Sequence, residues 1–388
     1  MEFKGIRILV LDGFCRQVAV ILKELHKMGC VITTLNDSKL DIGYASRYPK
    51  KKLIDKKFKG DTKYYEKLIF ELCESGEYDI IFPIIEESTE ILSRNYDVLS
   101  KKIKVIAPPY KAYLMASDKQ KTMELCMANG INCPRTKKDS ETLEEFLKCV
   151  KFPLACKPRV GRGSVGFLKV NNKEELDLLI NKGTIKVEEY VIQEFIPQGE
   201  IHRVSYTFID SDGEVKSSMI SKSSRPYPLE IGTNSLFESV DMPEIRRQSE
   251  KLLSLFGWQG YASVCFIESK FDAIPKVMEI NARISASFKI SVISGCKIIQ
   301  QLIERAYGVP AIKTEKVLFG CRVKHSQSSF LWFLKSKERF RKESNKRENH
   351  ITKDVVYSFS DPWPYFAYSL QCLGKYKKEM KKRSREIK

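Results

Sequence analysis

The chain has 388 residues, a hydrophobic fraction of 43% and a formal net charge of +18. This length predicts two or three packed units with a substantial core. The sequence has no run of about eighteen apolar residues, which argues against a membrane-spanning helix, and it begins with a predicted strand instead of a signal-peptide pattern. Eleven scattered cysteines without metal-ligand or redox spacing predict small buried thiols in a reducing cytoplasm.

The positive charge is concentrated at the end of the chain. Residues 335–388 contain 16 lysines and arginines against 7 acidic residues, which is half of the total excess. Such a segment could attract an acidic membrane surface or nucleic acid, or could be an ordinary solvated surface. We expect no nucleic-acid partner and keep the other two interpretations open.

The first 110 residues alternate between apolar strands and amphipathic helices. The expected strands are 6–11, 30–35, 79–85 and 104–107, and the expected helices are 17–28, 64–73 and 87–95. This alternation predicts a small parallel α/β domain over residues 1–110 that ends at Pro108-Pro109.

The middle of the chain predicts two further units. Helices over 119–129, 141–149 and 173–180 surround a hairpin at 152–170, which indicates a compact α+β unit over residues 111–190. Strands at 191–195, 201–209, 215–221, 262–268 and 276–280, with a helix at 242–257, predict a larger, mainly antiparallel sheet over residues 191–312. We interpret 221–227 as a mobile loop and 313–388 as a basic extension with a short helix at 330–341.

The segment Val277-Met278-Glu279-Ile280-Asn281-Ala282-Arg283 carries polar side chains on alternate positions. In a strand, Glu279, Asn281 and Arg283 point to one face. A carboxylate and an amide oxygen are hard ligands that suit Mg²⁺, and an arginine beside them suits a phosphoryl group. An ordinary polar sheet face is the alternative interpretation.

A lysine and three glycines stand upstream of that strand. The apolar stretch that ends at Lys157 runs into Gly161-Arg162-Gly163-Ser164-Val165-Gly166 before a second strand. Such a loop can bring backbone N–H groups close to phosphate oxygens, although an exposed turn would look the same. It lacks the Gly-Lys-Ser/Thr sequence that opens a helix in a Walker loop.

Taken in order, these motifs resemble the ATP-grasp superfamily from about residue 6 to residue 310. The series is Ser117-Asp118-Lys119, Lys157 with the glycine loop, Gln193-Glu194-Phe195-Ile196 with Gly199-Glu200, and the segment from Glu279 to Arg283. Within the superfamily the chain is most similar to the carbamoyl-phosphate-synthase-like branch, including single-module carboxylate–amine ligases. The resemblance implies an ATP-grasp fold, of α/β and α+β class: a parallel pre-domain, a small lid and a larger antiparallel sheet subdomain.

The resemblance also implies a function. It indicates an ADP-forming ligase that uses ATP with Mg²⁺ or Mn²⁺ to join a small-molecule carboxylate to an amine through an acyl phosphate. A carbamoyl-phosphate-type synthase or kinase with the same ATP site is one alternative, and a non-catalytic nucleotide-binding protein is another. With each of these interpretations we expect the protein to act in the cytoplasm, and a homodimer is consistent with all of them.

Particular residues receive roles from the resemblance. Phosphate-binding positions are Lys119, Lys157, Gly161, Gly163, Ser164 and Gly166; adenine and ribose positions are Gln193, Glu194, Phe195, Ile196 and Glu200; metal ligands are Glu279 and Asn281; catalytic cations are Arg283, Arg225 and Arg203. His202 and Arg203 alternate in direction along one strand, and we expect Arg203 to face the cleft. Ser285 and Ser287 are further candidates beside the substrate.

One position departs from the family pattern. The strand that supplies an earlier metal ligand in the relatives has Val264-Cys265-Phe266 here. A thiol is a soft ligand and a poor one for Mg²⁺. We expect Cys265 to serve in packing. Either Glu268 or water then substitutes as the metal ligand, or one metal is held more weakly, or the chain has lost full activity.

Overall fold

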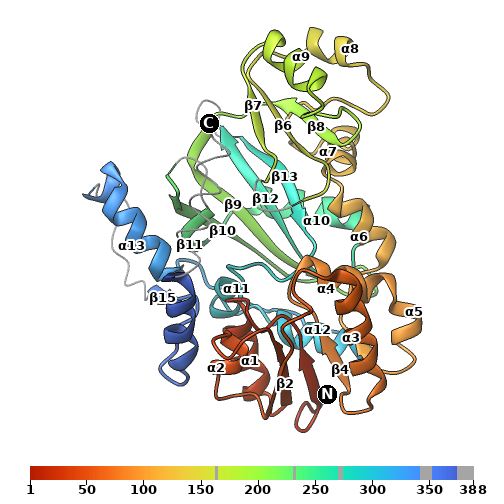
Figure 1. Cartoon of the computed structure of the whole chain (residues 1–388), viewed down its shortest axis with the longest axis vertical. Helices are drawn as coiled ribbons and strands as arrows, with labels where there is room; N and C mark the ends of the chain where they lie inside the picture. The colour runs from red at the N-terminus through yellow and green to blue at the C-terminus, as the bar shows by residue number, and fades with distance from the viewer. Residues whose placement is uncertain (162–164, 230–232, 270–273, 341–351, 374–388) are drawn as a thin grey trace.

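The computed structural model describes residues 1–161, 165–229, 233–269, 274–340 and 352–373, with the side chains of residues 198–201 outside this description. Three β-sheets with surrounding helices make up this part of the chain (Figure 1). One sheet is parallel, one is small and antiparallel, and one is large and almost wholly antiparallel. The predicted fold class is therefore confirmed.

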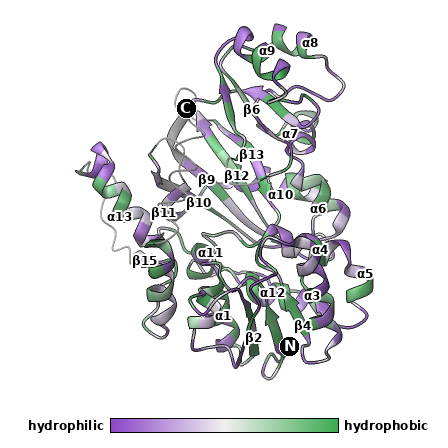
Figure 2. Cartoon of the chain, in the orientation of Figure 1, coloured by the Kyte–Doolittle hydropathy of each residue, from purple (hydrophilic) through white to green (hydrophobic). Residues whose placement is uncertain are grey.

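The parallel sheet has the strand order β3-β2-β1-β4-β5. Its strands are β1 (Arg7–Val10), β2 (Val31–Asn36), β3 (Lys51–Ile54), β4 (Ile80–Phe82) and β5 (Lys104–Val105). Its helices are α1 (Val18–Lys27), α2 (Ile42–Ala45), α3 (Thr62–Glu74), α4 (Glu86–Arg94) and α5 (Tyr96–Leu99). Figure 2 shows β4 as hydrophobic, and residues of this sheet belong to cores on both of its faces. The sequence pattern missed β3, which is short and half lysine.

The lid carries the small antiparallel sheet, in the order β7-β6-β8. Its elements are α6 (Tyr110–Ser117), α7 (Lys119–Ala128), α8 (Leu143–Lys148), β6 (Leu154–Pro158), β7 (Leu168–Val170), α9 (Lys173–Asn181) and β8 (Tyr190–Glu194). The prediction that placed 191–195 in the larger sheet was wrong, because β8 pairs along its length with β6. Strand identity could be read from the sequence, but the pairing partner could not.

The large sheet follows the order β13-β12-β9-β10-β11-β14-β15. Its strands are β9 (Gln198–Ile209), β10 (Val215–Tyr227), β11 (Thr233–Val240), β12 (Gly260–Ser269), β13 (Pro275–Asn281), β14 (Arg322–Lys324) and β15 (Thr352–Asp354). The expected loop at 221–227 is wrong, since these residues extend β10 and pair with β11.

Both faces of the large sheet are covered. On one face, Val264, Phe266 and Ile280 pack with residues of α6, α7 and α10 (Pro243–Leu255). On the other, Tyr206 and Phe208 join a core that includes α12 (Ile298–Ala306) and the parallel sheet, beside α11 (Lys289–Ile293). This shared core fixes the parallel domain against the large sheet.

The end of the described chain forms α13 (Ser326–Lys335), a 3-10 turn η1 (Lys337–Phe340) and a helix over residues 363–373. Figure 1 shows α13 and this last helix in blue on one edge of the molecule. Among the helices that the structure describes, none has the length and hydropathy needed to cross a bilayer.

Candidate active site

Two lysines of the lid lie close to the edge strand of the large sheet. Lys157 is the fourth residue of β6, and its Nζ donates to the carbonyl oxygen of Met278 on β13 at 3.3 Å. Lys119, the first residue of α7, is 8% exposed, and its Nζ donates to the carbonyl oxygen of Gly161 at 2.7 Å. The lid sheet, α7 and β13 therefore meet around two ammonium groups.

Burial dominates the electrostatics of Lys157. It lowers the pKa of the ammonium group to about 8, although the carboxylate of Glu279 acts in the opposite direction and the charge of Lys119 adds to the lowering. In water such a group would titrate near 10.5. A lysine held at this cost is suited to meet an anion that supplies the missing negative charge.

The glycine loop is described at its two ends. Gly161 accepts the Lys119 hydrogen bond, and Gly166 has a φ of +74°. A Cβ at Gly166 would lie 2.8 Å from Cγ of Pro158, so this position requires glycine for both reasons. Gly163 and Ser164, predicted to bind phosphate, lie outside the described residues.

The polar face of β12 and β13 contains Glu279, Asn281 and Cys265. Cys265 pairs with Glu279 in register, and Ser263 pairs with Asn281, so these side chains share one face. Nδ2 of Asn281 donates to Sγ of Cys265 at 3.2 Å, which turns the amide oxygen away from the sulfur. Burial raises the pKa of the Cys265 thiol to about 12. The sulfur is therefore a neutral neighbour beside one carboxylate and one amide.

This donor set fits a single Mg²⁺ that keeps several other ligands. The carboxylate of Glu279 and the amide oxygen of Asn281 are both hard donors, and Mg²⁺ usually takes its remaining ligands from phosphates and water. Within the described residues no cluster of three or more acidic, cysteine or histidine side chains could hold a metal. Glu268, expected as a substitute ligand, is instead paired with Arg203, whose Nε lies 2.9 Å from Oε1.

Arg283 joins the large sheet to the parallel domain. Its Nε donates to Oε1 of Glu86 at 2.7 Å, and its Nη1 donates to the carbonyl oxygen of Ile284 at 3.3 Å. Burial opposes the charge, but the partnership with Glu86 raises the pKa of the guanidinium above its usual value. The sequence analysis missed Glu86, the first residue of α4. Its one signal in the sequence is its position directly after the apolar segment that ends at Ile85.

A buried carboxylate positions the start of α4. Asp12 follows β1 and is fully buried, and its Oδ2 accepts from the hydroxyl of Ser88 at 2.6 Å, while its Oδ1 accepts from the hydroxyl of Tyr65 at 2.7 Å. Burial raises the pKa of Asp12 despite these hydrogen bonds. Asp12 thereby fixes the helix that presents Glu86 to Arg283.

The other two predicted catalytic cations lie elsewhere. Arg203 pairs in register with Phe266 and contacts Met242, so it lies on the α10 face of the large sheet, opposite to Glu279. Strand parity therefore gives His202 and Arg203 the reverse of the expected directions. Arg225 has a φ of +62° and lies over the ring of Trp332 at 5.1 Å, toward α13.

The predicted adenine hinge connects the lid to the large sheet. The side chain of Gln193 is 1% exposed, and its Oε1 has no hydrogen-bond partner among the described residues. Oε1 of Glu194 accepts from the backbone N–H of Arg135 and from Nζ of Lys276 at 3.1 and 3.2 Å. Phe195 lies beneath Nζ of Lys169.

Two further predicted residues of this region have a simple placement. Ile196 is buried, and the side chain of Glu200 lies outside the described residues. A buried amide oxygen that has no donor is the kind of atom that a ligand N–H satisfies.

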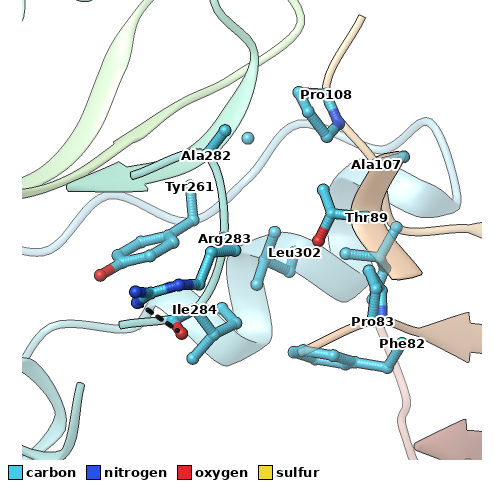
Figure 3. Close-up of a pocket in the computed structure, with 12 residues that line it drawn as sticks. Phe82, Pro83, Thr89, Ala107, Pro108, Tyr261, Ala282, Arg283, Ile284 and Leu302 are labelled. Atoms are coloured by element: carbon cyan, nitrogen blue, oxygen red, sulfur yellow. Dashed lines mark hydrogen bonds between the residues drawn. The ribbon is translucent and has the colours of Figure 1, made fainter. Parts of the chain in front are cut away.

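A small pocket lies where the parallel domain meets the large sheet (Figure 3). Pro83, Ala107 and Pro108 follow the carboxyl ends of β4 and β5, and Tyr261 and Arg283 form the opposite wall. Ligands of open parallel sheets usually bind at this edge. Ser285 and Ser287, predicted beside the substrate, instead bond the buried tyrosines Tyr261 and Tyr206 at 3.0 and 2.7 Å.

Comparison with known proteins agrees with this architecture. Residues 116–287 match the family model of the ATP-grasp domain. A D-alanine–D-alanine ligase of Fusobacterium nucleatum is 28% identical over 194 residues, which are 48% of this chain and 62% of that enzyme. The chain thus spans less than two thirds of this curated relative.

Solved structures share the fold at low identity. Biotin carboxylase from Campylobacter jejuni has a TM-score of 0.67 and 19% identity, with 82% of this chain and 75% of that chain covered. L-amino acid ligase from Bacillus licheniformis has a TM-score of 0.59 and 16% identity, with coverages of 78% and 74%. Residues 116–287, which include the lid sheet and most of the large sheet, therefore match an ATP-grasp domain, and the chain shares the fold of these solved structures.

Proposed function

We propose that this protein is an ADP-forming ligase that joins a small-molecule carboxylate to an amine by way of an acyl phosphate. The observation that carries the proposal is the convergence of Lys157, Lys119 and Glu279 between the lid and β13, with Arg283 two residues beyond Asn281. Two cations, one hard metal-binding pair and a further cation are the groups that phosphoryl transfer from ATP requires.

The proposed reaction has two steps. A carboxylate oxygen attacks the γ-phosphorus, the bond to the β–γ bridging oxygen breaks, and ADP leaves. The amine nitrogen then attacks the acyl carbon, phosphate leaves with the bonding pair, and the nitrogen loses a proton. Such a pathway depends mainly on positioning and on charges that stabilise the transferring group.

Named side chains can supply those charges. Lys157 and Lys119 would neutralise phosphate oxygens, and Arg283, oriented by Glu86, would face the transferring phosphoryl group. Gln193 would orient the adenine through its buried amide oxygen. Glu279 and Asn281 would hold Mg²⁺ or Mn²⁺, which when bound supplies further neutralisation of the phosphates.

The substrates bind in this proposal between the parallel domain and the large sheet. The D-alanine–D-alanine ligase and L-amino acid ligase among the relatives support an amino-acid-like carboxylate and amine. Action in the cytoplasm agrees with eleven free cysteines, and a homodimer stays a prediction.

A second candidate is a nucleotide-binding protein without turnover. The neutral thiol of Cys265 beside Glu279 favours it, because a thiol contributes no negative charge to a metal site. A carbamoyl-phosphate-type synthase or kinase would use the same ATP site with another acceptor.

Release of ADP distinguishes these candidates. The purified chain is incubated with ATP, Mg²⁺ and pooled carboxylates, with and without pooled amines. The ligase predicts ADP that requires both pools, and a kinase predicts ADP that requires the acceptor alone. Absence of ADP while ATP binds would identify the non-catalytic protein. The same assay on Lys157→Ala tests the role of Lys157. Its matched control is Lys151→Ala, which replaces an exposed lysine of the lid.

A further inference from the structure

The helix over residues 363–373 turns an apolar face to the solvent. Its four exposed side chains are all large and apolar: Trp363 is 67% exposed, Phe366 53%, Leu370 59% and Leu373 76%. Their spacing of three, four and three residues places them along one stripe. A surface helix of a soluble domain normally has the opposite arrangement, so this stripe indicates a binding surface.

The other side of this helix is anchored to the protein. Nε2 of Gln327 donates to Oγ of Ser369 at 2.8 Å, and Nε2 of Gln371 donates to Oδ1 of Asp41 at 2.8 Å. The ring of Tyr368 lies edge-on to His325, with centroids 5.7 Å apart. These contacts fix the orientation of the helix about its own axis, so the apolar stripe faces the solvent.

The neighbouring helix adds to the exposed apolar area. On α13, Phe330 is 62% exposed and Leu334 50%, and Phe340 beyond it is 77% exposed with Arg339 over its ring. Lys335 and Lys337 are exposed beside them. Both helices lie on the edge of the molecule away from the lid helices α8 and α9 (Figure 1).

The sequence directly after the stripe is strongly basic. Residues 374–388 contain eight lysines and arginines against two glutamates. The apolar spacing also continues in this sequence, at Tyr376, Met380 and Ile387. An apolar stripe next to a cluster of lysines and arginines is the pattern of segments that lie in the interface of an anionic membrane.

We propose that the face formed by Trp363, Phe366, Leu370 and Leu373 binds an anionic lipid surface. The four side chains enter the boundary between headgroups and acyl chains, and the positive charge of the sequence that follows adds an electrostatic attraction to the lipid phosphates. A second copy of the chain fits less well, because a two-fold interface over this face would bring two basic segments together. Nucleic acid would use the lysines and arginines but not Leu370 and Leu373. This binding is independent of the ligase activity.

Sedimentation of the full chain with vesicles tests the proposal. We expect binding to vesicles of phosphatidylcholine with phosphatidylserine, little binding to phosphatidylcholine alone, and weaker binding at high salt. Phe366→Ser with Leu370→Ser should weaken binding at least about tenfold, because each buried methylene is worth a factor of about four. The matched control is Leu178→Ser with Leu255→Ser, which are 51% and 41% exposed on α9 and α10.

Tryptophan fluorescence gives a second readout at the stripe itself. Of the three tryptophans, Trp258 is buried and Trp332 lies under Arg225, while Trp363 is exposed. Phosphatidylserine vesicles should shift the emission of the native chain to shorter wavelength. Trp363→Phe should remove most of this shift and keep the sedimentation.

Several results would overturn the proposal. One is a native chain that does not sediment with phosphatidylserine vesicles, and another is a Phe366/Leu370 variant that sediments as well as the native chain. A native dimer that the same variant converts to a monomer would identify a second copy as the occupant. Binding of the native chain to duplex DNA that this variant keeps, without vesicle binding, would identify nucleic acid.

Discussion

Lys157 combines a cost in stability with a proposed role in catalysis. Its pKa is about 8 in the folded chain and near 10.5 in water, so between these pH values the unfolded chain binds more protons and stability rises with pH. Below pH 8 the full cost of the buried ammonium group is present. The same buried charge is available to a phosphate.

Lys157→Met should therefore raise the free energy of unfolding without nucleotide, on the order of 1–3 kcal/mol at neutral pH. The gain should shrink as the pH rises from 8 to 10.5. Denaturant titrations across this range measure it, and Lys151→Met should show no such trend. The loss of phosphoryl transfer should be about 10²–10³-fold. Equal stability of native and variant chains at every pH would contradict the account of Lys157.

Cys265 gives a second prediction at the scale of one residue. Cys265→Asp adds a hard, charged ligand next to Glu279 and Asn281, so nucleotide should bind at a lower Mg²⁺ concentration. Cys265→Ser, which adds no charge, is the control and should resemble the native chain. Titration of nucleotide affinity against Mg²⁺ measures the effect. A Cys265→Asp variant that needs more Mg²⁺ than the native chain would show that this position is outside the metal shell.

Gly166 gives a prediction at the scale of the lid hairpin. Gly166→Ala combines a positive φ with a Cβ 2.8 Å from Pro158, so the hairpin must shift and nucleotide affinity should fall. Gly183→Ala, also in the lid and at φ +68° but with open space around the Cβ, carries the backbone cost alone, about 1 kcal/mol. Thermal unfolding and ADP binding of both variants separate clash from strain. Equal effects of the two substitutions on ADP binding would show that the contact between position 166 and Pro158 does not matter for nucleotide binding.

The contact between α4 and the end of β13 gives another prediction. Glu86→Gln leaves the guanidinium of Arg283 without its carboxylate and should cost roughly 1–3 kcal/mol, since both side chains keep some exposure. Glu90→Gln, on the same helix and in an exposed pair with Arg94, should cost less than about 1 kcal/mol. Denaturant unfolding compares the two. If Glu90→Gln lowered the free energy of unfolding as much as Glu86→Gln, the Glu86–Arg283 pair would contribute no more than an exposed ion pair.

The sequence predicted elements better than the contacts between them. Lys157 and Glu279 could be selected because each stands in a local motif with its own strand signal. Glu86 could not, because its partner Arg283 lies 197 positions away and no local pattern links them. The predicted direction of Arg203 was wrong for a similar reason. Both faces of β9 are covered, and only packing decides which face lies on the side of Glu279.

At the scale of the whole molecule, the sequence predicted the parallel sheet better than the membership of strands in the other two sheets. The alternation of strands and helices up to Pro108 predicted the parallel domain. The place of β8 in the lid sheet, and of β11, β14 and β15 in the large one, depends on long-range pairing that strand propensity does not encode. The shared core of Tyr206, Phe208 and α12 likewise joins distant parts of the chain.

The central claim is that the site around Lys157, Lys119 and Glu279 activates a carboxylate as an acyl phosphate. The most direct measurement uses a pool of carboxylates labelled with ¹⁸O, together with ATP, Mg²⁺ and pooled amines, and follows the label into phosphate by mass spectrometry. Transfer of a carboxylate oxygen to the phosphoryl group predicts labelled phosphate from the native chain, equal in amount to ADP, and about 10²–10³-fold slower formation of it by Lys157→Ala. ADP that forms while the phosphate stays unlabelled would contradict the acyl phosphate and with it the proposed ligase.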